Sequence, residues 1–114
     1  KYFQNIVEMA IRNENKTLPI ETEELTIESG TYDSCMVTYK ITIHEEKGYF
    51  ISHEVIDTQK QALIDALLSD PNSKQFITSC IKGGVSITYE YTNSITKNVV
   101  RVCILPTDLM IVTK

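Results

Sequence analysis

The sequence lacks several features that would assign a protein to a well-defined functional class. No apolar run approaches the roughly 20 residues needed to span a bilayer, and the longest is broken by Arg101, Pro106 and Asp108. There is no glycine-rich phosphate loop, because Gly83-Gly84 follows an expected helix, whereas anions bind where a helix begins. Repeats and low-complexity segments are also absent. We therefore expect no transmembrane segment and no phosphate-binding loop in this chain.

Basic residues are too few to attract polyanions. The chain has 15 acidic and 11 basic side chains, which gives a formal charge of -4. The overall field therefore repels phosphate backbones and anionic lipids. We exclude nucleic acid as a partner on this ground.

Cysteine is also scarce. Cys35, Cys80 and Cys103 are an odd number and show no CxxC spacing, so they indicate neither a complete disulfide scheme nor a zinc or redox motif. They leave the cellular compartment open. Because the sequence opens on Lys1 and not on methionine, it leaves room for a lost export signal upstream.

What remains is the composition of an ordinary folded protein. Of the 114 residues, 42% are hydrophobic and 23% are charged, far from the composition of disordered chains. A chain of this length buries roughly two thirds of its unfolded surface when it folds. We expect a single domain over residues 1–114.

The first half of the chain predicts one helix and two strands. Apolar residues recur at three- and four-residue spacing over 2–11, which is typical of an amphipathic helix that fades through 13–15. Alternation of apolar and polar residues then predicts strands at 25–28 and 36–44. A turn at Gly30-Thr31-Tyr32-Asp33 would separate the two strands.

The middle of the chain is ambiguous. Residues 45–48 either close a hairpin onto a short strand at 49–51 or lead into a helix, which we favour. Helical spacing begins near Ser52, although a capping box between Thr58 and Gln61 would start the helix later.

The end of that helix is better marked. Asp70-Pro71 combines a position that disfavours helix with an N-cap residue and a proline at the first position of a new helix. The new helix should run to Gly83, which can adopt the left-handed conformation of a C-cap.

The last third predicts a hairpin. Residues 85–91 alternate regularly between apolar and polar, a turn is expected near Asn93-Ser94, and a second strand covers 99–105. The residues on both faces of this second strand are mostly apolar, which favours a central position in the sheet. Residues 109–112 are expected to form a short terminal strand or a strap.

The one-sided alternation of the strands sets the expected fold class. Strands with one apolar and one polar face are typical of antiparallel sheets that are packed on one side only. The expected inner residues are Val37, Tyr39, Ile41, Ile43, Val85, Ile87, Tyr89 and Tyr91. We predict an α+β fold with an antiparallel sheet of about four strands, helices packed on one face, and the order α-β-β-α-α-β-β.

No group of residues predicts a catalytic or metal site. A cysteine nucleophile needs a base beside it, but Cys35 has the parity of the buried sheet face and His44 has the opposite parity. Cys80 lies in the apolar stripe of a helix. His44 and His53 lack the spacing of metal ligands and are expected at the surface, and carboxylates such as Glu14 are expected to be solvated. We predict no catalytic residue, no metal and no cofactor.

Two surfaces are candidates for binding a partner. The polar sheet face would be rich in hydroxyls and of mixed charge, and its candidate residues are Thr38, Lys40, Thr42, Thr88, Glu90 and Arg101. Tyr49 and Phe50 are further candidates, because with Ile51 they form an apolar cluster after a charged turn, and such a cluster marks a partner site when it is exposed. The alternatives are a merely solvated sheet face and an aromatic cluster that caps the core.

The sequence resembles a family of small exported bacterial proteins that look like short domains behind a lipoprotein leader or membrane anchor. The resemblance covers roughly Asn15 to Leu109. The segments that carry it are Asn15-Lys16-Thr17-Leu18-Pro19, Val37-Thr38-Tyr39-Lys40-Ile41-Thr42, Lys60-Gln61-Ala62-Leu63, Asp70-Pro71, Gly84-Val85-Ser86-Ile87-Thr88-Tyr89-Glu90-Tyr91 and Pro106-Thr107-Asp108. The family implies no known activity.

The resemblance implies a location rather than a chemistry. It points to the periplasm, a membrane anchor or the exterior of a bacterium, whereas the residues alone leave a cytoplasmic location open. Members of the family carry two cysteines that look like a disulfide pair, and Leu68 and Leu109 occupy the matching positions here. Joint replacement by leucine is compatible with an apolar contact in place of a cross-link.

Three functional hypotheses follow. We favour a non-enzymatic envelope or secreted domain that binds another macromolecule, in the first instance a protein. The second hypothesis is a small-ligand carrier or an enzyme with a pocket between helices and sheet, lined by Tyr39, Tyr89 and Tyr91. The third is an inhibitor or immunity-type protein that presents an acidic loop such as Glu45-Glu46. The sequence does not specify an oligomeric state.

Overall fold

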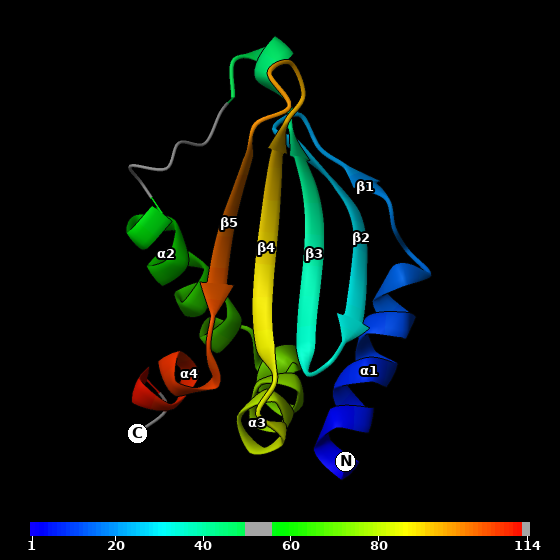
Figure 1. The fold of residues 1–114 in the computed structure, drawn as a ribbon, viewed down its shortest axis with the longest axis vertical. Coiled ribbons are helices and arrows are strands. Elements are labelled where there is room, and N and C mark those ends of the chain that lie inside the picture. The colour runs from blue at the N-terminus through cyan, green and yellow to red at the C-terminus, as the bar shows by residue number, and fades with distance from the viewer. Residues whose placement is uncertain (50–55, 113–114) are drawn as a thin grey trace.

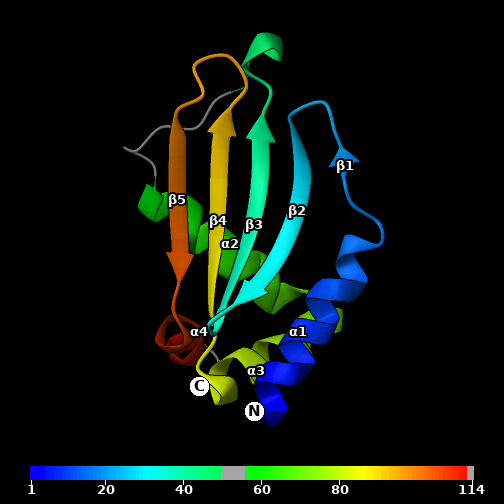
Figure 2. The same ribbon diagram turned by 45° about the vertical axis from the view of Figure 1, so that its right-hand side comes forward.

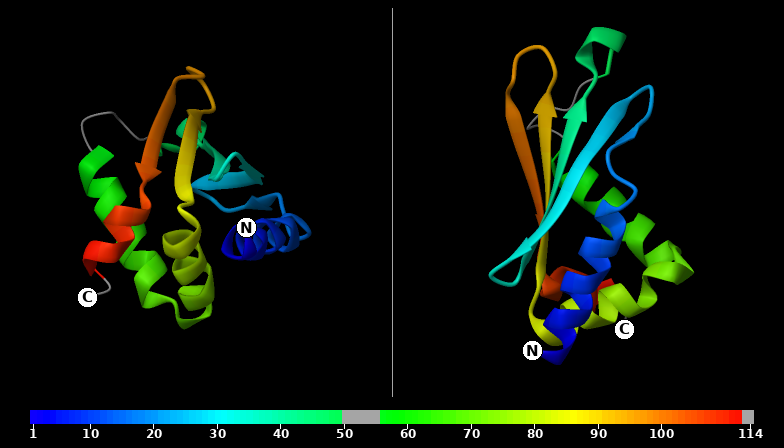
Figure 3. Two further views of the ribbon diagram at one scale, coloured as in Figure 1. Left: turned by 60° about the horizontal axis from the view of Figure 1, so that its bottom comes forward. Right: turned by 90° about the vertical axis from the view of Figure 1, so that its right-hand side faces the viewer.

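The computed structural model describes residues 1–49 and 56–112 of the chain. A mixed sheet forms one layer and the helices α1, α2 and α3 form a second layer on one of its faces (Figures 1 and 3). The elements are α1 (Tyr2–Asn15), β1 (Ile20–Glu21), β2 (Leu25–Asp33), β3 (Met36–Ile43), the 3-10 turn η1 (Glu45–Lys47), α2 (Ile56–Ser69), the 3-10 turn η3 (Pro71–Ser73), α3 (Lys74–Gly83), β4 (Ser86–Asn93), β5 (Val99–Ile104) and α4 (Pro106–Val112). The predicted α+β class, with helices on one face, is confirmed.

The sheet differs from the prediction in strand number and in one strand direction. It has five strands in the order β1-β2-β3-β4-β5, because the short β1 adds to β2. All neighbouring pairs are antiparallel except β3 and β4, which are parallel. The chain returns through α2 and α3 before it enters β4, as Figure 2 shows. The alternation of apolar and polar residues indicates which face of the sheet a residue occupies, but it does not indicate strand direction. The parallel pairing of β3 with β4 therefore could not be predicted from the sequence pattern.

The predicted turn at Gly30-Thr31-Tyr32-Asp33 is wrong. Strand β2 continues to Asp33, and the hairpin turns at Ser34 and Cys35, both with positive φ. Two residues with φ > 0 give the tight turn that matches the twist of a hairpin. A Cβ at Gly30 would lie 3.1 Å from the Tyr39 ring, so this glycine provides space for packing within the strand.

The C-terminal region holds two further corrections. Strand β5, predicted to be central, is an edge strand. The apolar residues on its second face point outward: Cys103 is exposed, and Leu105, just after the strand, is 47% exposed. The segment expected as a terminal strand or strap belongs to the helix α4, which begins at Pro106. Proline at the first helical position was the signal that the sequence offered.

The helix boundaries agree more closely with the prediction. Helix α1 runs to Asn15 without fading, and the Asn15 side chain accepts a hydrogen bond from the Gly30 backbone N–H at 2.9 Å, which ties the helix end to β2. Helix α2 begins at Ile56 among the described residues, and Ser52 lies outside them. Asp70 caps the η3 turn that precedes α3, accepting from the Asn72 N–H at 2.9 Å.

The core lies between the sheet and the helices. A first cluster joins α1, α2, α3 and α4 to the lower sheet through residues such as Val7, Ile64, Cys80, Ile87 and Leu109. Leu68 packs against this same cluster, so both positions of the implied disulfide contribute to one apolar core. A second cluster, consisting of Ile41, Ile43, Tyr91 and Val102, covers the rest of the inner face.

Candidate functional site

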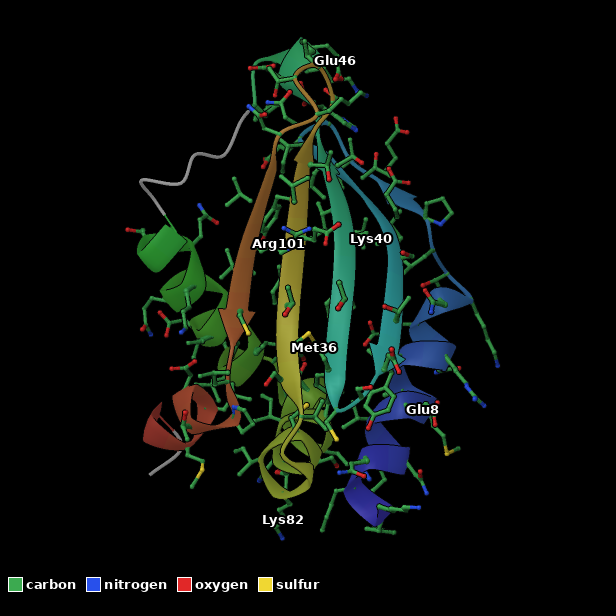
Figure 4. All side chains as sticks on the ribbon, in the orientation of Figure 1. Glu8, Met36, Lys40, Glu46, Lys82 and Arg101 are labelled. Atoms are coloured by element: carbon green, nitrogen blue, oxygen red, sulfur yellow. The ribbon has the colours of Figure 1, made fainter. Side chains whose placement is uncertain are left out.

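The polar face of the sheet carries a row of charges across three strands. Lys40 on β3 is paired in register with Glu90 on β4, which in turn faces Arg101 on β5. The Arg101 Nε–H donates to Glu90 Oε2 at 3.1 Å. Figure 4 shows Lys40 and Arg101 on the face that no helix covers. The outer sheet face therefore brings together residues that the sequence placed there.

The hydroxyl groups on either side of this row largely have partners within the sheet. Thr42 donates to the Glu28 carboxylate at 2.8 Å, and the Thr88 hydroxyl reaches the Met36 sulfur at 3.5 Å. Thr88 is itself buried. Because these groups satisfy one another, the face presents little that requires a ligand. A binding role for Thr38, Lys40, Thr42, Thr88, Glu90 and Arg101 stays a prediction.

The aromatic candidates lie elsewhere. Tyr49 is half-buried and packs against the second core cluster, on the inner side of the sheet. Its backbone N–H donates to the carbonyl of His44 at 3.3 Å. Phe50 and Ile51 lie outside the described residues. Tyr49 therefore fits the alternative in which the aromatic residue caps one end of the core.

Three residues considered for chemistry make structural contacts. Burial raises the pKa of the Cys80 thiol to about 12, which removes its thiolate at neutral pH. His44, expected at the surface, is 7% exposed, and its ring contacts the Thr26 hydroxyl at 2.8 Å. Glu14, expected to be solvated, is exposed near the end of α1 and accepts a hydrogen bond from the Tyr39 hydroxyl at 2.9 Å. His53 lies outside the described residues.

The described residues form neither a metal-binding cluster nor a membrane-spanning helix. In residues 1–49 and 56–112, no group of three or more His, Cys, Asp or Glu side chains is placed to hold a metal ion. Within the same ranges, no helix has the length and apolar character required to cross a bilayer.

The sequence did not reveal a groove on the helical side of the molecule, between α2 and α3. It has a volume of about 560 Å³. Its lining residues are Leu68, Asp70, Pro71, Lys74, Ile77, Thr78, Ile81 and Lys82. Leu68 and Ile81 are half-buried and Ile77 is buried, so the floor is apolar. The i, i+4 spacing of Ile77 and Ile81 was a signal of an apolar helix face, but only packing decides how much of that face the core covers.

The rim of this groove is positively charged. Lys74 and Lys82 are exposed, lie eight residues apart on α3, and both line the groove. Lys74 forms no ion pair with any residue in the described part of the chain, and the Lys82 ammonium lies 5.3 Å from the centroid of the Phe3 ring. Asp70 is engaged in capping η3. A basic rim is thus present on a chain of charge -4.

Comparison with known proteins shows a shared fold. No family model matches the sequence, and no curated protein matches it. Solved structures that resemble the chain include two pilotins of type II secretion systems, EpsS from Vibrio vulnificus (12% identity, 95% of this chain and 92% of that one, TM-score 0.69) and AspS from Vibrio cholerae (12%, 94% and 92%, 0.66). A third is a protein from Pseudomonas aeruginosa described as secreted (14%, 90% and 88%, 0.66). The chain is similar to these proteins in fold along nearly its whole length.

Proposed function

We propose that this protein is a non-enzymatic envelope or secreted domain that binds a partner protein in the groove between α2 and α3. The observation that carries the proposal is the combination of a half-buried apolar floor with a basic rim whose lysines form no ion pair among the described residues. Exposed apolar surface bordered by polar residues is typical of protein-binding sites. A partner segment with an apolar stripe and acidic flanks complements both features.

The length of the groove along α3 suits a short amphipathic helix. Lys74 and Lys82 are eight residues apart, so the rim extends about 12 Å along α3, which is two helical turns. Ile77 and Ile81 lie between them and would meet partner side chains at i, i+3 and i+4 spacing. Acidic residues on the partner helix would then face the two lysines.

The outer sheet face supports binding less well than the groove. Glu90 and Arg101 form an ion pair, and Thr42 donates to Glu28, so a ligand would have to replace existing bonds. The outer face also lacks a continuous apolar floor, since Met36 is its large exposed hydrophobic residue on β3. It serves as the matched control surface for the groove.

The location in the cell envelope or outside the cell is supported by two independent likenesses. The sequence segments resemble small exported bacterial proteins, and the fold resembles two type II secretion pilotins and a protein described as secreted. Fractionation of the full-length, tagged protein in its own bacterium tests this part. Recovery with cytoplasmic markers would contradict it.

Titration of isotope-labelled protein with a designed peptide tests the groove. The peptide is a helix with leucines at i, i+3, i+4 and i+7 and glutamates on both flanks. We expect NMR shifts at Ile77, Ile81 and Leu68, and K74E/K82E should weaken binding by about tenfold or more. The control K40E reverses a charge on the outer sheet face and should leave binding unchanged. Equal binding of a peptide with lysines in place of the glutamates would contradict the proposal.

Photo-crosslinking extends the test to the natural partner. A photoreactive residue replaces Thr78, which is exposed between the two lysines, in the full-length protein. The control site is Thr31 on the outer side of β2. We expect a single protein to be captured from position 78 and not from position 31. Capture of the same protein from both positions would contradict binding in the groove.

A further inference from the structure

A second hollow lies on the inner side of the sheet, next to the end of α1, and it is separate from the groove between α2 and α3. It has a volume of about 270 Å³. The lining residues are Glu14, Thr17, Leu18, Ile20, Ile27, Tyr39, Ile41 and Tyr89. They come from α1 and the turn that follows it, and from β1, β2, β3 and β4. The tyrosine pocket, as we call it, is therefore built by segments far apart in the sequence.

Two tyrosines from the parallel pair of strands form one wall. Tyr39 and Tyr89 are paired in register, and their rings stack with centroids 5.3 Å apart. The Tyr39 hydroxyl donates to Glu14 Oε2 at 2.9 Å, which fixes the carboxylate at the pocket. Tyr91, the third tyrosine expected at such a pocket, is buried in the second core cluster. The sequence therefore anticipated two of the three.

The Tyr89 hydroxyl is available to a ligand. No residue in the described part of the chain forms a hydrogen bond with it, and every fully buried side-chain oxygen or nitrogen there has a partner. Tyr89 is half-buried and its side chain lines the pocket, so a ligand that enters the pocket would lie beside this residue. A phenol that lines an apolar pocket without a partner can donate to or accept from a bound molecule.

The charge in the pocket has one sign. Glu14 is the charged residue among the lining residues, and it has no ion pair with any described residue. Four further lining residues are aliphatic: Leu18, Ile20, Ile27 and Ile41. A carboxylate beside two aromatic rings attracts a cation, because the face of a tyrosine ring is negative. Because these lining residues are aliphatic, the part of the ligand beyond its charged group should be apolar.

We propose that the tyrosine pocket binds a small organic cation, an alkyl- or arylalkylammonium, with its ammonium group on the Glu14 carboxylate. The apolar part of the cation lies against Ile27 and Ile41, and Tyr39 and Tyr89 border the charged end. The pocket is slightly smaller than sites for drug-sized ligands, which favours one ring or a short chain. This proposal is independent of partner binding in the groove between α2 and α3.

Three probes of similar shape and different charge test it. Phenethylammonium is the cation, 2-phenylethanol is the neutral control and phenylacetate is the anion. Titration of isotope-labelled full chain should shift the resonances of Tyr89 and Ile41. We expect the cation to bind about tenfold or more tightly than the alcohol, because it gains a charged hydrogen bond. Phenylacetate should bind more weakly than the alcohol.

The variant Glu14→Gln isolates the charge. It removes the carboxylate while an amide oxygen can still accept from Tyr39, and cation and alcohol should then bind alike. Glu8→Gln, on the same helix, is the matched control and should keep the preference for the cation. Circular dichroism checks that both variants fold.

Three results would overturn the proposal. The first is an absence of shifts at Tyr89 and Ile41 with millimolar phenethylammonium, and the second is an equal affinity for cation and alcohol in the unmodified chain. The third is a preference for the cation that survives Glu14→Gln. A loss of peptide binding in K74E/K82E affects none of these outcomes, so the two proposals fail separately.

Discussion

Lys60 on α2 and Asp108 on α4 form an ion pair with 3.0 Å between the ammonium nitrogen and the carboxylate oxygen. The same carboxylate oxygen accepts a hydrogen bond from the Leu105 backbone N–H at 2.8 Å. Leu105 precedes α4, so Asp108 supplies the returning arm of a capping box at the helix start. A single aspartate thereby begins the C-terminal helix and fastens it to α2.

Replacing the two residues should separate these roles. Lys60→Met removes only the partly exposed ion pair and should lower the free energy of unfolding by about 0.5 kcal/mol. Asp108→Ala removes the cap as well and should cost about 1–2 kcal/mol. Urea denaturation measures both, with Lys74→Met as the control for loss of a surface lysine that has no ion pair among the described residues. Equal losses from both variants would refute the capping role.

The same aspartate predicts a pH dependence. The hydrogen bond from the Leu105 N–H, followed by the Lys60 ammonium, lowers the pKa of Asp108 below its ordinary 3.8. A lowered folded-state pKa stabilises the fold above the unfolded value, and the stability is lost as pH falls through the folded value. An NMR titration should place the Asp108 midpoint below 3.8, and Lys60→Met should raise it. A midpoint unchanged by Lys60→Met would show that the pair contributes nothing.

The sequence was a good guide to which residues face inward. Alternation placed Val37, Ile41 and Ile87 in the core, and all three are buried. Period-two alternation follows directly from the pleat of a strand and does not depend on which strand is the neighbour. Strand neighbours and directions depend on the path of the connections. For that reason the parallel pairing of β3 with β4 and the edge position of β5 were not predicted.

For the candidate sites, too, the sequence predicted what depends on local strand pattern and missed what depends on packing. The pattern placed Lys40, Glu90 and Arg101 on one face because parity alone decides that. The groove between α2 and α3 depends on how far apart two helices pack, and the pocket around Tyr39 depends on where the end of α1 lies. Neither is a local property of the sequence. Proline at position 106, with Asp108 at the third helical position, was a local signal for α4 that went unused.

Buried phenols predict a fold that weakens at high pH. Burial raises the pKa of Tyr39, Tyr89 and Tyr91, with the Glu14 carboxylate adding to the effect at Tyr39. A raised folded-state pKa gives stability that is complete below the unfolded value of about 10 and is lost as pH rises through the folded value.

Two measurements check this alkaline prediction. In an ultraviolet titration, phenolate absorbance from these three tyrosines should appear only as the protein unfolds above pH of about 10. Tyr89→Phe removes one such group and should reduce the slope of unfolding free energy against pH in that range. Full, reversible ionisation of all six tyrosines in the folded state would contradict the prediction.

Gly30 makes a final prediction about packing at the tyrosine pocket. An added Cβ would lie 3.1 Å from the Tyr39 ring, which is tighter than most real Cβ contacts, and 3.5 Å from Ile11, so the ring would have to move by a few tenths of an ångström. The ring cannot move freely, because its hydroxyl is bonded to Glu14 and its face stacks on Tyr89. Gly30→Ala should therefore lower the free energy of unfolding by about 1–3 kcal/mol. Ser29→Ala, at the neighbouring position of the same strand, should stay within about 0.5 kcal/mol. If Gly30→Ala instead stabilised the protein, as a glycine replacement without a clash does, the contact between this strand and the Tyr39 ring would be looser than the structure describes.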